Sequence, residues 1–280
     1  MQKVLYIGIF GDSIFLNVNK LPKPGETIQT NDCFHEFGGK GFNQAYMTKR
    51  LGGDVTFISS IGNDDLGQEL IEKIKEKEVN HIYIKKDKNT CFGVILTEQS
   101  AENEVIVYSG ATLDESDFKT IKGEIDKSDI ISLQLEINYN LIEQIVKYAK
   151  EQGKTVILNA SPIMDISSII NLIDLFVVNT VEAIAIFGEK FKDTILEKKL
   201  NVIVTSSIGA TYISSEIKEY KTIKVNVKDT VGAGDVFLGT LNYYISIGTQ
   251  IEDAIPIALE YASKSVEIEH VLNAIDKIIS

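Results

Sequence analysis

Short apolar segments recur along the chain and alternate with segments whose apolar residues follow helical spacing. Segments that are apolar almost throughout are typical of strands covered on both faces. We expect core strands at Val4–Ile9, Val55–Ser59, Ile130–Leu135, Thr155–Asn159, Leu175–Asn179 and Val202–Ser206. Helical spacing is clearest at Leu66, Leu70, Ile71 and Ile74 and at Leu141, Ile142, Ile145, Val146 and Ala149. The alternation predicts a three-layer α/β/α fold with a mostly parallel sheet between helices.

Two stretches depart from this alternation. Ser13–Phe37 has no helical period, and Thr90–Ser109 predicts two strands, Cys91–Thr97 and Glu104–Tyr108, joined by a polar loop at Glu98–Asn103. We expect the segments at about 13–37 and 90–109 to pair as a small antiparallel β lid; a plain edge extension of the main sheet is the alternative. Because the sequence has no internal repeat or Pro/Ser-rich linker, we expect one continuous domain over residues 1–280.

The charge balance limits the partners of the chain. Its 280 residues carry a net charge of −12, with a pI near 4.8, and such a surface repels nucleic acid and anionic membranes. Arg50 is the only arginine, which nearly excludes a bidentate arginine clamp for phosphate. A bound phosphate would therefore need backbone amides, lysines or a metal ion.

The two cysteines, Cys33 and Cys91, have neither metal-ligand spacing nor a C-x-x-C pattern, and a reduced, cytoplasmic pair is the simplest interpretation. The N-terminal residues MQKVLYIGIF predict a buried strand rather than a signal peptide. No segment has 18 uninterrupted apolar residues, so we expect no membrane span.

The segment DTVGAGD, from Asp229 to Asp235, is the most informative part of the chain. Gly232 and Gly234 allow a tight turn that brings backbone N–H groups close to a ligand, and the apolar residues that follow predict a helix. A helix N-terminus favours an anion. Asp235 adds a carboxylate, which we expect to be ionised at pH 7 with a pKa near or below its reference value. A phosphate cradle beside a base suits phosphoryl transfer to a hydroxyl, whereas a glycine-rich turn with an Asp N-cap is the alternative.

A second glycine-rich turn, GGKGFNQA at Gly38–Ala45, also precedes a predicted helix. Lys40 opposes the helix dipole there, which suggests a residue placed for a ligand rather than for folding. Asn43 can present both a donor and an acceptor to sugar-like hydroxyls. A tight turn with a solvent-facing Lys40 is the alternative.

Polar residues also follow two of the predicted strands. Asn179 and Glu182 come at the end of one strand, and Glu136 at the end of another, where open α/β sheets bind ligands. Glu182 can hold a water-coordinated Mg²⁺ or can cap a helix, and Glu136 can be a solvated strand-end acid. The chain has no P-loop, HExxH or GxSxG motif and no GxGxxG after its first strand. The histidines His35, His81 and His270 form no cluster in the sequence and suit surface or packing positions.

GGKGFNQ, Glu136, the NxxE at 179–182 and DTVGAGD occur in an order that resembles the ribokinase (PfkB-type) family of carbohydrate kinases. The resemblance runs from about Tyr6 to about Ala262 and includes Pro24-Gly25-Glu26 and the stretch Gly62–Gly67. It implies a sugar kinase with the ribokinase-like fold, whose lid covers the sugar and often joins two subunits. A homodimer formed through the lid is therefore expected.

The resemblance also implies roles for single residues. Asp235 matches the catalytic base, and the amides of Gly232, Ala233 and Gly234 match the anion hole over the transferring phosphate. The residues that match sugar contacts are Gly39, Lys40, Asn43 and Glu136. Those that match the organisers of Mg²⁺ and the nucleotide phosphates are Asn179 and Glu182. Asp229 and the carbonyl of Val231 match part of a monovalent-cation site, which implies K⁺ as a further cofactor.

The chain departs from the family pattern at three places. Gly11-Asp12-Ser13 stands where ribokinases carry Asn-x-Asp, so Asp12 would reach the sugar shifted by one position, and the identity of the sugar stays open. Thr205, Ser207 and Gly209 match nucleotide contacts of the family, but Ser207 replaces the first glycine of this loop, which implies an altered nucleotide loop. His270-Val271 replaces a Gly-Ala pair near the cation and the adenine.

These features predict ATP-dependent phosphorylation of a primary hydroxyl on a small sugar, with Mg²⁺ as cofactor. A nucleoside kinase of the same fold is the first alternative. A relative that binds a sugar or nucleotide without phosphorylating it is the second. A dinucleotide-dependent oxidoreductase would lack its first-strand fingerprint.

Overall fold

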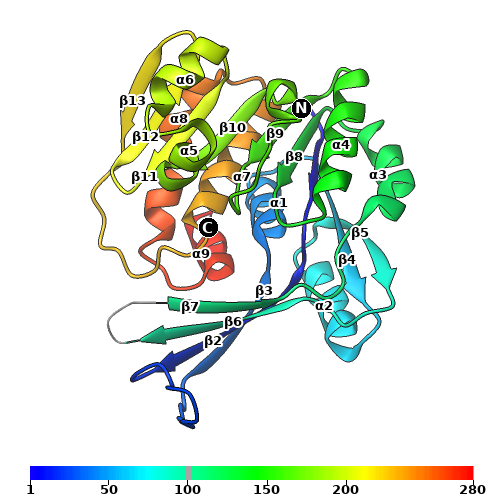
Figure 1. The fold of residues 1–280 in the computed structure, drawn as a ribbon, viewed down its shortest axis with the longest axis vertical. Coiled ribbons are helices and arrows are strands. Elements are labelled where there is room, and N and C mark those ends of the chain that lie inside the picture. The colour runs from blue at the N-terminus through cyan, green and yellow to red at the C-terminus, as the bar shows by residue number, and fades with distance from the viewer. Residues whose placement is uncertain (99–102, 280) are drawn as a thin grey trace.

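The computed structural model describes residues 1–98 and 103–279, so residues 99–102 of the predicted loop Glu98–Asn103 lie outside the described part. Within it, a nine-stranded sheet has the order β13-β12-β11-β10-β9-β8-β1-β4-β5 (Figure 1). Its strands are β1 (Val4–Ile7), β4 (Val55–Gly62), β5 (Asn80–Lys86), β8 (Ile130–Gln134), β9 (Thr155–Asn159), β10 (Leu175–Asn179), β11 (Val202–Ser206), β12 (Gly209–Ile213) and β13 (Ile217–Lys221). The sheet is parallel from β11 to β5, and β12 and β13 are antiparallel.

Helices cover both faces of this sheet, as the sequence predicted. The helices are α1 (Lys40–Arg50), α2 (Asp65–Glu76), α3 (Phe118–Ile125), α4 (Tyr139–Glu151), α5 (Thr180–Phe187), α6 (Phe191–Lys198), α7 (Ala233–Ser246), α8 (Ile251–Ser265) and α9 (Val271–Ile278), with 3-10 turns η1 (Glu115–Asp117) and η2 (Ile170–Leu172). Successive side chains of a strand point to opposite faces. Val4 and Tyr6 therefore join the core under α1, α2, α7, α8 and α9, whereas Leu5 and Ile7 join the core under α3 to α6.

The predicted strands lie where the apolar segments placed them. β9, β10 and β11 have the predicted bounds, β1 ends two residues early at Ile7, and β4 continues to Gly62. The sequence pattern missed β5, β12 and β13. β5 and β13 are edge strands with alternating exposed residues, and β12 lies beside β13 at the antiparallel end of the sheet.

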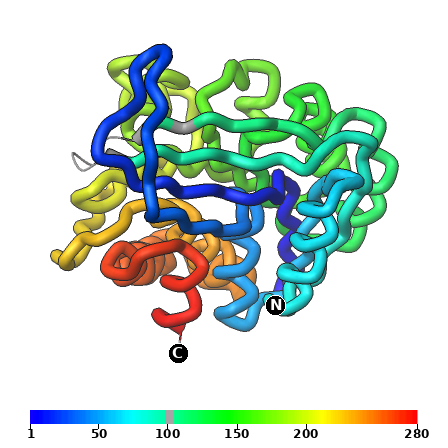
Figure 2. Tube along the Cα trace, turned by 90° about the horizontal axis from the view of Figure 1, so that it is seen from below, coloured from blue at the N-terminus to red at the C-terminus, as the bar shows by residue number. Residues whose placement is uncertain are grey.

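The two stretches that departed from the alternation form a separate small sheet with the order β3-β2-β6-β7. Its strands are β2 (Gly11–Val18), β3 (Cys33–Gly38), β6 (Phe92–Glu98) and β7 (Asn103–Tyr108). Each stretch is antiparallel within itself, and the central pair β2–β6 is parallel. A separate sheet is thus confirmed, and the alternative of an edge extension is wrong. Figure 2 shows these strands running across one side of the α/β body.

Among residues 1–98 and 103–279, no helix is both long enough and apolar enough to cross a lipid bilayer.

Candidate active site

A cavity of about 190 Å³ lies where β9, β10 and β11 end and where α1, α5 and α7 begin. Ligands of open α/β sheets bind at such carboxyl ends of strands. Its lining residues are Lys40, Asn159, Ser161, Val177, Val178, Asn179, Glu182, Thr205, Gly232, Gly234 and Asp235. Seven of these were predicted as site residues from the sequence, namely Lys40, Asn179, Glu182, Thr205, Gly232, Gly234 and Asp235.

Asp235 lies in the first turn of α7 and is 7% exposed. Its Oδ2 accepts a hydrogen bond from Asn43 Nδ2 at 3.0 Å, and its Oδ1 accepts one from Gln44 Nε2 at 2.9 Å. Burial raises the pKa of Asp235 to about 6, against the lowering effect of these two donors and of Lys40. The expectation of a pKa at or below the reference value was therefore wrong, because loss of hydration outweighs the donors. At pH 7 the carboxylate is still mainly ionised.

Gln44 is a site residue that the sequence analysis missed. It is fully buried, and its Oε1 accepts a hydrogen bond from Gln134 Nε2 at 2.7 Å while its Nε2 donates to Asp235. An amide chain thus runs from β8 through α1 to the carboxylate on α7. The apolar face that the sequence predicts for this helix, Phe42, Ala45 and Tyr46, does not include position 44, yet α1 is buried from Gly41 to Thr48. The available signal in the sequence was the position of Gln44 beside Asn43 in the GGKGFNQA segment.

Glycines are required at the starts of both helices. Gly232 caps α7 with φ 75°, and a Cβ there would lie 2.4 Å from Val271 Cγ2. Gly39 caps α1 with φ 139°, and its Cβ would lie 2.5 Å from the carbonyl oxygen of Ile9. The amide of Ala233 donates to the carbonyl of Thr230 at 3.3 Å. A Cβ at Gly234 would meet nothing within 4 Å, so this glycine leaves open space at the cavity.

The Lys40 side chain is 35% exposed but is held by a partner, so the alternative of a solvent-facing Lys40 holds only in part. Its ammonium group forms an ion pair with Glu136 Oε1, and its backbone N–H donates to Glu136 Oε2 at 3.3 Å. Burial lowers the pKa of Lys40, but the negative charges of Glu136, Asp235 and Glu182 outweigh it and raise this pKa. Lys40 is therefore a cation at the cavity that feels three carboxylates, of which Glu182 and Asp235 line the cavity and Glu136 lies beside it. The Glu136 side chain is 12% exposed and paired with Lys40, so it is not a freely solvated acid at a strand end.

Asn179 and Glu182 form a capping box at the start of α5. Asn179 Oδ1 accepts a hydrogen bond from the Glu182 amide at 2.9 Å, and Glu182 Oε2 accepts one from the Asn179 amide at 2.8 Å. The capping interpretation is therefore confirmed for Glu182. Both residues also line the cavity, so capping and ligand contact do not exclude each other.

Several predicted site residues do not line this cavity. Asp12 Oδ2 lies 2.7 Å from His35 Nδ1. Both residues are on the same face of the small sheet as Phe37, and the Phe37 ring contacts the ammonium group of Lys73 in α2. Ser207 is exposed in the turn between β11 and β12, and Gly209, with φ 148°, begins β12.

The predicted cation ligands lie just before α7. Asp229 Oδ1 accepts a hydrogen bond from the Val231 amide at 2.9 Å, and its Oδ2 accepts one from the His270 amide at 3.0 Å. Val231 itself is 47% exposed. Asp229 therefore ties the DTVGAGD segment to the start of α9.

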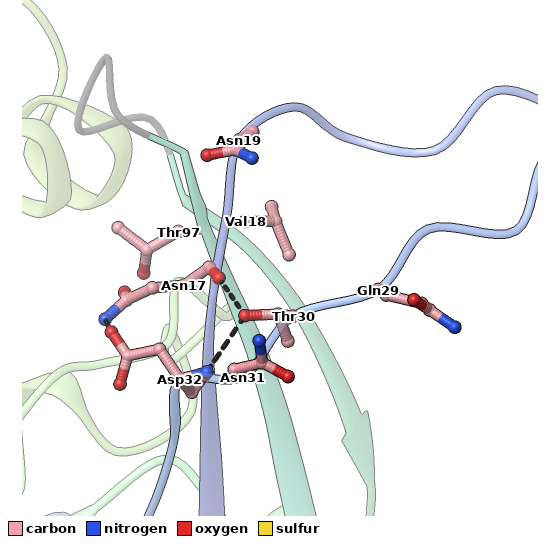
Figure 3. A pocket seen from close by; sticks show the side chains of 8 residues that line it. All are labelled: Asn17, Val18, Asn19, Gln29, Thr30, Asn31, Asp32 and Thr97. Atoms are coloured by element: carbon pink, nitrogen blue, oxygen red, sulfur yellow. Dashed lines mark hydrogen bonds between the residues drawn. The ribbon is translucent and has the colours of Figure 1, made fainter.

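A larger cavity, of about 660 Å³, lies at the outer end of the small sheet (Figure 3). Its amide and hydroxyl groups bond one another: Asn17 Nδ2 donates to Asp32 Oδ2 at 2.6 Å, and Thr30 Oγ1 donates to the carbonyl of Asn17 at 2.5 Å. Its one charged lining residue, Asp32, is exposed. The smaller cavity is therefore the candidate active site, because it gathers the buried carboxylates of Glu182 and Asp235, a lysine and a helix N-terminus.

Within residues 1–98 and 103–279, no group of three or more His, Cys, Asp or Glu residues could hold a metal ion. Glu182 still offers carboxylate oxygen at the cavity, the ligand type that Mg²⁺ prefers, and Mg²⁺ commonly keeps several waters and substrate phosphates as ligands. The residues present therefore fit a water-coordinated Mg²⁺ rather than a caged one.

Comparison with known proteins finds a carbohydrate kinase family and relatives that are sugar kinases. The family model described as pfkB family carbohydrate kinase matches residues 1–277. A ribokinase of Staphylococcus aureus is 30% identical, covering 94% of this chain and 92% of that protein. A Dictyostelium discoideum ribokinase is 29% identical over 95% of this chain and 94% of its own length. A Salmonella typhi deoxyribokinase is 27% identical, covering 89% of this chain and 87% of that protein.

Solved structures show the same fold. The crystal structure of a Thermotoga maritima ribokinase superimposes with a TM-score of 0.88 at 28% identity, covering 98% of this chain and 96% of that one. An Arabidopsis thaliana ribokinase complexed with ribose and ATP has a TM-score of 0.85 at 22% identity, covering 100% of this chain and 99% of that one.

Proposed function

The chain belongs to the pfkB family of carbohydrate kinases, and from this premise we propose that it transfers the γ-phosphoryl group of ATP to a primary hydroxyl of a small, ribose-like sugar. The observation that carries the proposal is the position of Asp235. Its buried carboxylate lies in the first turn of α7, directly after the glycines whose amides begin that helix, and Gly232, Gly234 and Asp235 all line the same cavity. A base and an anion-binding helix end at one place are what phosphoryl transfer to an alcohol requires.

In the proposed reaction Asp235 accepts the hydroxyl proton while the sugar oxygen bonds to the γ-phosphorus and the bond to the ADP oxygen breaks. A pKa of about 6 suits this role, since the group is mostly ionised at pH 7 yet more basic than an exposed carboxylate. The amides of Gly232 and Gly234, with the positive end of α7, stabilise charge on the transferring group, and the Ala233 amide can join them only if it leaves the Thr230 carbonyl.

The sugar is held by hydroxyl contacts from Gly39, Lys40, Asn43 and Glu136, and Asp12 is a further candidate. Asn43 already donates to Asp235, so a sugar that bonds Asn43 is placed against the base. The ion pair of Lys40 and Glu136 offers both a donor and an acceptor to vicinal hydroxyls. Positioning of this kind supplies much of the rate enhancement in a two-substrate transfer.

The nucleotide contacts proposed are Asn179, Thr205, Ser207, Gly209 and Gly234. Asn179 and Glu182 would hold Mg²⁺ through water, and a bound Mg²⁺ neutralises charge on the phosphates. Asp229 and the Val231 carbonyl would bind a monovalent cation such as K⁺. We also propose a cytoplasmic location, which suits the free thiols of Cys33 and Cys91.

The test is ADP release with ATP and Mg²⁺ over a panel of ribose, deoxyribose, hexoses and nucleosides, with and without K⁺. A ribose-like sugar is expected to give the highest kcat/KM. A preference for nucleosides would support a nucleoside kinase instead, and binding without ADP release would support a non-catalytic relative.

Asp235→Asn tests the mechanism directly. We expect this variant to fold and bind ATP but to lose about 10²–10⁴ in turnover, the usual cost of losing a general base. Asp117→Asn is a matched control, because Asp117 is also buried but forms an ion pair with Lys86 away from the cavity. Near-normal kcat in Asp235→Asn would remove this residue from the mechanism.

A further inference from the structure

The first turn of α9 is held by carboxylates from two distant parts of the chain. Its N-cap residue, His270, makes no side-chain cap. Instead Asp229 Oδ2 accepts the His270 amide at 3.0 Å, and Glu36 Oε1 accepts the Leu272 amide at 2.9 Å. Glu36 lies in β3 of the small sheet, 236 residues before its partner. Acidic groups at a helix N-terminus stabilise it through its unpaired amides and its dipole.

The small sheet packs closely on this turn. Glu36 is 8% exposed, and the ring of Phe34, on the same face of β3, stacks on His270 with centroids 3.5 Å apart. Phe15 of β2 meets the same imidazole ring at 6.1 Å. Figure 2 shows α9, in red, beside the blue strands of the small sheet.

The same turn contacts the segment that begins α7. Val271 fills the place that a side chain at Gly232 would take, only 2.4 Å from its ideal Cβ. Asp229, three residues before Gly232, holds the amide of His270. The turn His270–Leu272 therefore touches the small sheet on one side and the segment Asp229–Gly232 on the other.

We propose that Glu36 is a positioning residue that fixes the small sheet to the first turn of α9 and thereby sets the position of the amides at Gly232–Gly234. This inference rests on the proposed function, in which those amides face the transferring phosphate. The small sheet and the phosphate end of the cavity then move together, because a packed turn shifts as a unit. Glu36 acts through Val271 and Asp229 and touches no substrate itself.

The experiment compares Glu36→Ala with Glu36→Gln, which keeps an acceptor for the Leu272 amide. Glu36→Ala is expected to lower kcat by about 10- to 100-fold, the cost of a small misplacement at a reacting centre, while KM for ATP changes little. Glu36→Gln restores much of kcat. Asp114→Ala is the control, since Asp114 also caps a helical turn, at the Ser116 amide, away from the cavity.

Amide hydrogen exchange gives a readout independent of activity. Glu36→Ala should raise exchange in residues 228–236 as well as at 271–273, although residue 36 lies in neither segment. Increased exchange confined to 33–38 and 271–278, with unchanged kcat, would show a purely structural contact and overturn the proposal.

A second variant keeps the proposal testable if Glu36→Ala does not fold. Val271→Ala removes the two Cγ methyl groups that lie against Gly232 and leaves the Glu36 contact to Leu272 in place. This variant should also lower kcat and raise amide exchange at residues 228–236. A normal kcat with normal exchange would refute the step in which Val271 sets the position of Gly232. Failure of the wild-type chain to phosphorylate any sugar would count against the proposed function alone, because the exchange measurement tests the coupling without turnover.

Discussion

At the scale of single residues, the carboxylate of Asp235 is governed by two opposing effects. Burial removes water from the charged form, and the amide donors of Asn43 and Gln44 replace part of that hydration. The balance leaves the pKa at about 6, above its ordinary value of 3.8. The base is thereby strengthened while it stays mostly ionised at neutral pH.

Activity should therefore have an acid limit set by Asp235. Below pH 6, kcat/KM is expected to fall about tenfold per pH unit, because only the ionised carboxylate accepts the proton. A pH–rate profile of the free enzyme measures this limit. A profile that is flat down to pH 5 would contradict the assignment.

The same raised pKa affects stability. Since the folded state binds this proton more tightly than the unfolded state, the contribution is present below pH 3.8 and is lost as the pH rises through about 6. At about 1.4 kcal/mol per pKa unit, the difference is roughly 3 kcal/mol. Unfolding by urea should show this decline for the wild type but not for Asp235→Asn.

Gln44→Ala tests the amide chain. Removing the Nε2 donor should raise the pKa of Asp235 further and move the acid limit of kcat/KM to higher pH, because that donor favours the ionised form. Gln144→Ala, on the exposed side of α4, is the control. An unshifted limit in Gln44→Ala would mean that the donor does not tune the base.

At the scale of elements, the start of α7 combines a fold requirement with a site requirement. Gly232 is needed for its φ and for the approach of Val271, whereas Gly234 lies in the helix with open space at its Cβ position. The second glycine is therefore not explained by packing. It keeps the cavity wall free of a side chain where the phosphate is proposed to lie.

Gly234→Ala should separate the two requirements. It is expected to keep or slightly raise stability, by about 0.5–1 kcal/mol as for other helical Gly→Ala changes, and yet to weaken ATP use by crowding the cavity. Gly123→Ala, in α3 with equally open space, should show the stability change with normal kinetics. Unchanged kinetics in Gly234→Ala would place the phosphate elsewhere.

At the scale of the whole molecule, the small sheet leaves apolar side chains uncovered. In the described part of β7, Ile106 is 66% and Val107 60% exposed, and β3 and β7 are open edges. Open edges favour pairing with another chain. We therefore expect a homodimer formed through this sheet.

Light scattering of the purified chain at micromolar concentration tests this expectation. Ile106→Lys should shift the mass from dimer to monomer, because a charge cannot be buried unpaired in such an interface. Ile247→Lys, at the far end of α7 and 44% exposed, should leave the mass unchanged. A wild-type monomer would exclude the dimer at that concentration.

Much of this architecture could be predicted from local patterns. β9, β10 and β11 have the bounds predicted because strands buried on both faces give uninterrupted apolar segments. Edge strands such as β5 did not stand out, since half of their side chains meet water. Gln44 and Glu36 were missed because their partners lie 191 and 236 residues away.

The sequence by itself determined the layers of the fold, the glycine turns and the acid that follows the second turn, because each depends on neighbours within a few residues. Only the tertiary structure decided the protonation of Asp235, the pairing of Lys40 with Glu136 and the contact of the small sheet with α9. Burial and long-range hydrogen bonds exist only when distant segments pack together, so no local pattern could encode them.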